Sequence, residues 1–188
     1  MTLLVAFCIL VVLAFILMPM RGGGRGSPRV ACMSNLRQLG LLMTQYAAIH
    51  NNEYPDSFET LILFNSPNFH AKILICPTSN DKPPTYQTVS ELAQRLGSAG
   101  RPDNFAAAAS KPSLHLSYIY CGNGLTGKSS PKSILGYEPL ANHNGRTINF
   151  LFRDTHVESI PAAVALKMIK ELQSGHNPPR TEVLNNGP

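Results

Sequence analysis

The 188-residue chain lacks the local patterns by which many enzymes and zinc proteins are recognised. None of its four cysteines has a CxxC or CxxH spacing, which argues against a structural zinc site. Signatures of Ser/His/Asp or Cys/His catalysis are also missing. Its net charge of +5 is not gathered into the basic patch that nucleic-acid binding requires. We therefore expect no catalytic residue, metal, cofactor, small-molecule substrate or nucleic-acid partner.

An uncharged apolar segment occupies the N-terminus. Sixteen consecutive apolar residues run from Leu3 to Met18, and the first charged side chain is Arg21. A membrane-spanning helix needs about 17–20 such residues, so we interpret residues 1–20 as a transmembrane anchor in a lipid bilayer. Neither a basic start nor a small-residue cleavage site is present, which favours a retained anchor over a cleaved signal peptide. The positive charge after the segment would by itself place the following domain in the cytoplasm.

A basic, glycine-rich linker and a helix follow the anchor. Residues 21–29 (RGGGRGSPR) read as a flexible linker, and the spacing of apolar residues predicts an amphipathic helix over 30–50. Its apolar stripe consists of Cys32, Leu36, Leu39, Met43 and Tyr46. Shorter helices are predicted at 57–64 and 88–96. Asp56 is the expected N-cap of the first helix, and Glu59, three residues later, is expected to bond back to the backbone amide of the cap.

The last third of the chain alternates between strands and turns. Predicted strands cover residues 114–121, 133–140, 147–152 and 156–160, and a helix follows over 161–172. Together these elements predict one α+β domain over 30–173, with an amphipathic helix packed on a small antiparallel sheet. The remaining residues, 174–188, are rich in Asn, Gly and Pro and predict a disordered tail.

Two patterns could be mistaken for functional sites. Residues 122–129 (GNGLTGKS) match the G-x-x-x-x-G-K-S phosphate loop, whose mechanism needs a helix beginning at Lys128. Pro131 disfavours that helix, so we expect a glycine-rich turn. His143, Asp154 and His156 flank one predicted hairpin and could converge on a metal, but the ligand set is incomplete, and we interpret them as turn residues.

Four stretches of the chain match a family pattern. They are residues 31–40 (ACMSNLRQLG, similar to C-x-N-N-L-K-Q-[IL]-G), 53–57 (EYPDS, similar to Y-P-x-S), 75–77 (ICP) and 142–158, similar to a closing H-N-G…N-V-L-F-x-D-G-H-V-E hairpin. The chain thereby resembles the pseudopilin-like, prepilin-type proteins (type II secretion G-like) of planctomycete-type bacteria. The matching hairpin residues are Asn142, His143, Asn144, Gly145, Asp154 and His156; Thr155 stands where the family has glycine.

The resemblance implies a pilin-like fold and an extracytoplasmic position. The domain would then be periplasmic, held by a single-pass helix in the bacterial inner membrane. Three cysteines lie outside the apolar run, so at most one internal disulfide can form among them. The family landmarks favour the pair Cys32 and Cys76, with Cys76 and Cys121 as the alternative.

The resemblance also implies a structural function. We expect a non-catalytic envelope protein, a minor or accessory subunit of a type II secretion or type IV pilus-like system. Its partners would be other pilin-like subunits. The family's G-F-T-L-I-E processing site is missing and Gly22 to Gly24 interrupt the helix, which predicts weak self-assembly. The alternative is a membrane-tethered extracytoplasmic binding domain; a P-loop-type nucleotide-binding enzyme is the least favoured function.

Overall fold

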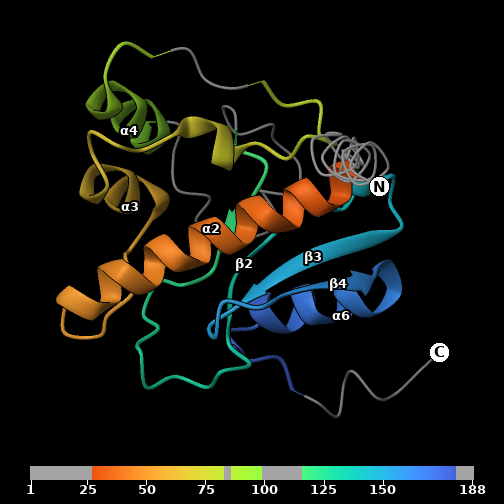
Figure 1. The fold of residues 1–188 in the computed structure, drawn as a ribbon. Coiled ribbons are helices and arrows are strands. Elements are labelled where there is room, and N and C mark those ends of the chain that lie inside the picture. The colour runs from red at the N-terminus through yellow and green to blue at the C-terminus, as the bar shows by residue number, and fades with distance from the viewer. Residues whose placement is uncertain (1–26, 83–85, 99–115, 181–188) are drawn as a thin grey trace, which may run out of the picture.

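The computed structural model describes residues 27–82, 86–98 and 116–180. The predicted anchor, 1–20, and most of the predicted linker lie outside these ranges. Within them, no helix combines the length and the apolar character needed to cross a membrane. The fold is α+β, as predicted: helices α2 and α6 lie on either side of an antiparallel sheet (Figure 1).

Helix α2 spans Pro28–Ile49 and forms the predicted amphipathic helix. It begins two residues earlier than predicted, because Pro28 is favoured in the first helical turn; the linker therefore ends before residue 28. The buried side of α2 contains Cys32, Leu36, Leu39, Gly40, Met43 and Ala47. Four of the five predicted stripe residues are buried, whereas Tyr46 is only half-buried.

The sheet is a four-stranded meander in the order β1-β2-β3-β4. Its strands are β1 (Ile119–Tyr120), β2 (Ile134–Tyr137), β3 (Thr147–Phe152) and β4 (Val157–Pro161), each antiparallel to its neighbour. The bounds of β3 agree with the prediction, because its apolar run is bounded by clear turn residues. β1 is shorter than predicted and pairs through only two residues.

Each face of the sheet contributes to a separate hydrophobic cluster. Leu151 belongs to the cluster formed with α2, and Phe150 and Phe152 belong to the cluster formed with α6 (Ala162–Gln173). Successive residues of a strand point to opposite faces, so Asn149 shares the α2 face with Leu151. This register places a buried amide beside the first turns of α2.

Two short α-helices and two 3-10 turns complete the described fold. They are α3 (Phe58–Phe64), η1 (Ala71–Leu74), α4 (Val89–Ser98) and η2 (Leu140–His143). Ser57, rather than the predicted Asp56, caps α3: its hydroxyl accepts a hydrogen bond from the Thr60 amide at 3.3 Å. The sequence suggested this helix correctly and placed its cap one residue too early.

The first part of the predicted disordered tail is ordered. The Asn177 side chain bonds both backbone groups of Ile134: Oδ1 accepts from the amide at 2.7 Å, and Nδ2 donates to the carbonyl at 2.9 Å. Arg180 forms an ion pair with Glu171 at 2.6 Å. These contacts correct the prediction for residues 174–180, because local composition does not reveal that the side chain of Asn177 bonds the backbone of the first residue of β2. Residues 181–188 lie outside the described ranges.

A buried cluster around the Cys32 and Cys76 disulfide

A disulfide joins α2 to the loop that follows η1. Cys32 and Cys76 are both fully buried, their Cα atoms are 4.8 Å apart, and 44 residues separate them in the sequence. Of the two pairings considered from the sequence, this is the one implied by the resemblance. Cys121 carries a free thiol.

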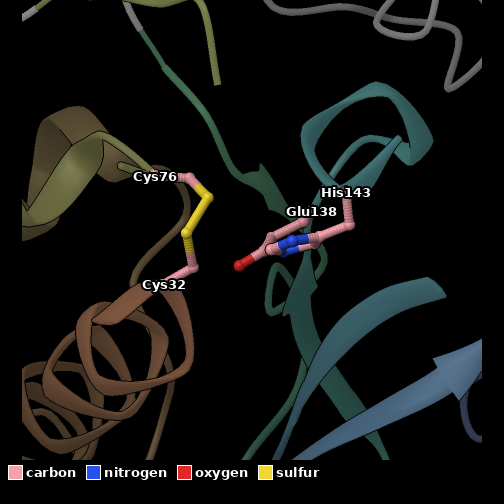
Figure 2. A group of neighbouring side chains, drawn as sticks. All are labelled: Cys32, Cys76, Glu138 and His143. Atoms are coloured by element: carbon pink, nitrogen blue, oxygen red, sulfur yellow. A yellow bond between two sulfur atoms is a disulfide. The ribbon is translucent and has the colours of Figure 1, made fainter. Parts of the chain in front are cut away.

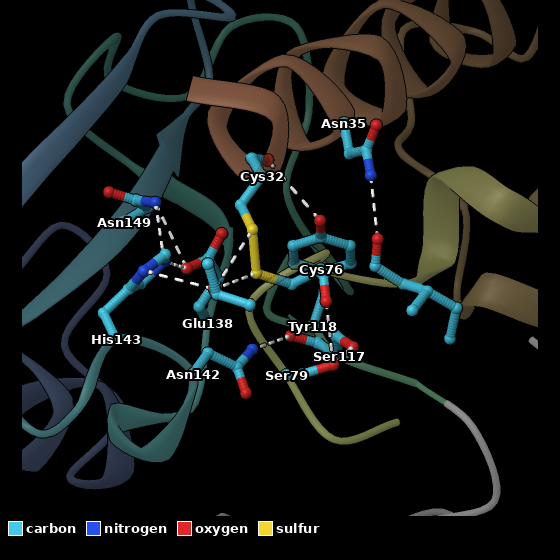
Figure 3. The surroundings of a disulfide bond; sticks show 12 residues. Cys32, Asn35, Cys76, Ser79, Ser117, Tyr118, Glu138, Asn142, His143 and Asn149 are labelled. Carbon is cyan, nitrogen blue, oxygen red and sulfur yellow. Dashed lines mark hydrogen bonds and ion pairs between the residues drawn. A yellow bond between two sulfur atoms is a disulfide. The ribbon is translucent and has the colours of Figure 1, made fainter. Parts of the chain in front are cut away.

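Thr78 connects the disulfide to a histidine. Its hydroxyl oxygen is 2.9 Å from Cys76 Sγ and 3.4 Å from Cys32 Sγ. The same oxygen is 3.3 Å from Nδ1 of His143. One hydroxyl group therefore lies between Nδ1 of the imidazole and the sulfur atoms. Figure 3 shows His143 and Glu138 beside the disulfide.

Glu138 and His143 form a buried acid–base pair next to the disulfide. Glu138 immediately follows β2 and its side chain is 0% exposed, while the side chain of His143 is 6% exposed. Glu138 Oε2 is hydrogen-bonded to His143 Nε2. The Asn149 amide donates to the same carboxylate oxygen at 3.2 Å, and its nitrogen is 3.1 Å from His143 Nε2. Strand β3 thus positions the carboxylate and the imidazole against each other.

Burial moves the two pKa values of this pair in opposite directions. Desolvation raises the pKa of Glu138 to about 7, although the Asn149 hydrogen bond and the charge of Arg29 oppose the shift. Desolvation, helped by the same Arg29 charge, lowers the pKa of His143. The carboxyl therefore keeps its proton to a higher pH than an ordinary glutamate, and the imidazole stays neutral to a lower pH than an ordinary histidine.

Two polar atoms of the cluster are buried without a hydrogen-bond partner. They are Glu138 Oε1 and Asn149 Oδ1. An unpartnered buried polar atom costs free energy, so such atoms point to a structural or binding role of their surroundings. Figure 2 shows one oxygen of Glu138 directed toward the disulfide.

Cys32, Cys76, Glu138 and His143 can each offer one metal-ligand atom, and these four atoms lie within 4.8 Å of one another. The sequence predicted no metal site, because the recognisable ligand patterns consist of residues that lie close together in the chain. Here the cysteines are 44 residues apart, and Glu138 was not singled out at all. Two features of the sequence could have pointed to the cluster. Glu138 directly follows an apolar strand, and Asn149 is a polar residue inside another apolar strand.

The residues of the predicted closing hairpin divide between two places. Asn142 is buried, and its amide donates to the Ser117 carbonyl at 3.0 Å. Asn144 and Gly145 adopt φ values of 55° and 72°, as the predicted Asn-Gly turn requires. Asp154 and His156 lie instead in the turn after β3, where their exposed side chains pair with each other. About six residues of strand, roughly 20 Å, separate this turn from His143, so the hypothetical metal set of His143, Asp154 and His156 does not form.

The phosphate-loop lookalike is a series of turns. Within residues 122–129, Thr126 forms an isolated β-bridge with Glu53, and no helix begins at Lys128. The loop is held by its backbone: the Gly127 amide donates to the Asn52 carbonyl at 2.6 Å, and Arg153 Nη1 donates to the Gly127 carbonyl at 2.9 Å. It therefore lacks the helix N-terminus on which phosphate binding depends.

We expect Lys128→Ala to change the free energy of unfolding by less than about 0.5 kcal/mol, because Lys128 lies on the surface of a turn. Urea denaturation provides the measurement. Arg153→Ala is the matched comparison and should cost about 1 kcal/mol, since it removes the hydrogen bond to Gly127. A Lys128→Ala variant that loses measurable ATP binding would contradict this interpretation of the loop.

In the comparisons with known proteins, no family model, no curated protein and no solved structure matches the chain.

Proposed function

We propose that the chain is a non-catalytic, pseudopilin-like protein of the bacterial cell envelope, anchored through residues 1–20, with its domain outside the cytoplasm. The observation that carries the proposal is the buried disulfide between Cys32 and Cys76. Disulfides form and persist mainly in oxidising compartments and are rare in the cytosol. This bond therefore favours the extracytoplasmic side over the orientation suggested by the basic residues after the anchor.

The position of the disulfide also suits a tethered domain. It lies near the N-terminal end of α2, the helix that follows the apolar segment in sequence, and it fixes that end to the loop after η1 (Figure 2). A force from the membrane anchor would therefore act on the domain at the end of α2 that the disulfide cross-links. Helix α2 also packs on the sheet through Leu36, Leu39 and Leu151, so its apolar stripe is used within the domain.

The arrangement supports an accessory role more than a self-assembling one. Because the sheet buries the stripe of α2, this stretch leaves few large apolar side chains for a neighbouring subunit; Val30, Leu41 and Ile49 are the exposed exceptions in this helix. The proposed function is therefore that of a minor subunit, which joins a type II secretion or pilus-like assembly through partners that supply regular N-terminal helices. The protein alone is expected to be monomeric in detergent.

Thiol trapping in intact cells tests the proposed location. In the full-length protein we expect Cys32 and Cys76 to be protected from an alkylating maleimide until reductant is added, and the protein to remain with the membrane fraction. A reporter that is active only outside the cytoplasm, fused after Pro188, should be active. The matched control is the same fusion without residues 1–26, which should leave the membrane and lose reporter activity. Free Cys32 and Cys76 thiols in an inactive fusion would place the domain in the cytoplasm and refute the proposal.

A further inference from the structure

The donor groups around the disulfide come from three distant parts of the chain. Cys32 lies in α2, Cys76 follows η1, Glu138 precedes η2, and His143 is the last residue of η2. We propose that reduction of the disulfide converts this cluster into a binding site for one divalent metal ion of the zinc class, with Cys32, Cys76, Glu138 and His143 as ligands. The proposal does not depend on where the domain resides.

The geometry suits a four-coordinate ion. The four candidate ligand atoms lie within 4.8 Å of one another. In a tetrahedral zinc site, bonds of about 2.0–2.3 Å place neighbouring ligand atoms roughly 3.3–3.8 Å apart. Rotation of the two released cysteine side chains is the movement needed to reach such distances. Two sulfurs, one nitrogen and one carboxylate oxygen form a donor set that prefers zinc to calcium or magnesium.

The unpartnered carboxylate oxygen is the second observation that points to a cation. Glu138 is 0% exposed, its Oε2 bonds His143, and its Oε1 has no partner. One carboxylate oxygen is directed toward the two cysteines (Figure 2). A buried carboxylate is normally compensated by a positive charge or by hydrogen bonds. A metal ion between Oε1 and the two sulfurs would provide that compensation.

The orientation of His143 agrees with the same arrangement. Its Nδ1 is on the sulfur side, in contact with the Thr78 hydroxyl at 3.3 Å, while its Nε2 bonds the Glu138 carboxylate. Nδ1 could therefore bind the ion without loss of the bond at Nε2. A hydrogen bond at the second ring nitrogen is the usual way in which proteins orient a metal-binding imidazole. Thr78 is half-buried, and its hydroxyl is the group that the ion would displace from Nδ1.

Formation of the metal site requires reduction of the disulfide and then binding of the ion. A dithiol reductant supplies two electrons and two protons, becomes a cyclic disulfide itself, and leaves two cysteine thiols. The metal ion then binds both sulfurs as thiolates and releases the two thiol protons to solvent; where Glu138 is protonated, binding of its carboxylate releases that proton to solvent as well. Because the sulfurs bonded to each other are unavailable as thiolate ligands, the disulfide and the bound metal exclude one another. Oxidation would expel the ion and restore the cross-link.

Cobalt(II) titration of the full-length protein in detergent tests the site. The protein is reduced with a dithiol, freed of reductant by anaerobic gel filtration, and titrated with Co²⁺ alone. We expect one equivalent to bind, with thiolate-to-cobalt charge-transfer bands and intense tetrahedral ligand-field bands that Zn²⁺ then abolishes. The oxidised protein should show neither. Reduced protein that remains folded by circular dichroism and gives no such spectrum would overturn the proposal, and this comparison requires no substitution.

Three variants identify the ligands. Loss of a residue that only supports a metal ligand typically weakens metal binding by about 10-fold or more. Loss of a ligand itself should cost at least as much, so His143→Gln and Glu138→Gln should each weaken Co²⁺ binding by more than about 10-fold. Cys121→Ser, which removes the free thiol outside the cluster, should leave both stoichiometry and spectrum unchanged. Equal affinity in the wild type and both glutamine variants would show that the cysteines bind alone and would refute the four-ligand site.

Discussion

Removal of the disulfide by the double substitution Cys32→Ala and Cys76→Ala is expected to lower the free energy of unfolding by about 3–4 kcal/mol. The bond closes a loop across a sequence separation of 44 residues. The chain-entropy model gives about 4 kcal/mol for such a loop at 25 °C, and native-state effects usually reduce the measured value. A loss of this size is a large fraction of the stability of a single domain. Thermal denaturation should show the midpoint falling by about 10 °C.

The control for this experiment is Cys121→Ala. Cys121 is a free, half-buried cysteine, so its substitution should cost less than about 1 kcal/mol, and the cost should not depend on reductant. Reductant should lower the melting temperature of the wild type and of Cys121→Ala, while the double variant should be insensitive. If the double variant melts at the wild-type temperature without reductant, the disulfide does not close in solution.

The elements that the sequence predicted well depend on local patterns. The 3.6-residue spacing from Cys32 to Met43 predicted α2, and the Asn-Gly turn with the apolar run after it predicted the bounds of β3. Both signals lie within the element itself. The resemblance to a known family, rather than spacing, favoured Cys32 over Cys121 as the partner of Cys76.

The features that the sequence did not predict depend on contacts between distant residues. Asn177 appeared to belong to a disordered tail, yet its side chain bonds the backbone of Ile134. Glu138 appeared unremarkable, because only the folded chain brings it beside His143 and the disulfide. A search for metal ligands by local spacing could not detect a cluster drawn from residues 32, 76, 138 and 143.

The acid–base pair predicts a pH dependence that is hidden in the wild type and visible in single variants. Glu138 has a raised pKa in the folded state, from an ordinary value of 4.5 to about 7. Taken alone, it stabilises the fold at low pH, and that contribution is lost as the pH rises from about 4.5 to 7. His143 has a lowered pKa, below its ordinary value of 6.5. Taken alone, it stabilises the fold at high pH, and that contribution is lost as the pH falls below 6.5.

The two contributions cancel over part of the pH range. Between about pH 4.5 and 6.5 the unfolded chain carries one proton on the histidine. At any pH in this range that lies above the lowered pKa of His143, the folded protein carries its one proton on the glutamate. Equal proton numbers mean that the pair adds no slope to stability against pH. Asp154 also has a lowered pKa, because slight desolvation is outweighed by its contacts with His156, but this contribution is the same in the wild type, His143→Gln and Glu138→Gln.

Substitution of either partner should therefore reveal a slope of opposite sign. We expect His143→Gln to lose stability relative to the wild type as the pH rises from 5 to 6.5, because Glu138 remains buried and must ionise. Glu138→Gln should lose stability relative to the wild type as the pH falls over the same interval, because His143 must then accept a proton in a buried position. A full one-proton difference corresponds to about 1.4 kcal/mol per pH unit, so each slope should be on the order of 1 kcal/mol per unit.

Urea denaturation of the oxidised, metal-free protein, with EDTA present, measures these slopes. His156→Gln is the matched control: it removes an exposed histidine paired with Asp154 and leaves Glu138 and His143 intact. Its stability should follow the wild-type pH profile apart from the small contribution of that exposed pair. Curves for Glu138→Gln and His143→Gln that run parallel to the wild type would show that the two groups do not exchange one proton on folding. Opposite slopes would instead establish that burial against α2 makes the carboxyl, rather than the imidazole, the proton carrier of the folded protein.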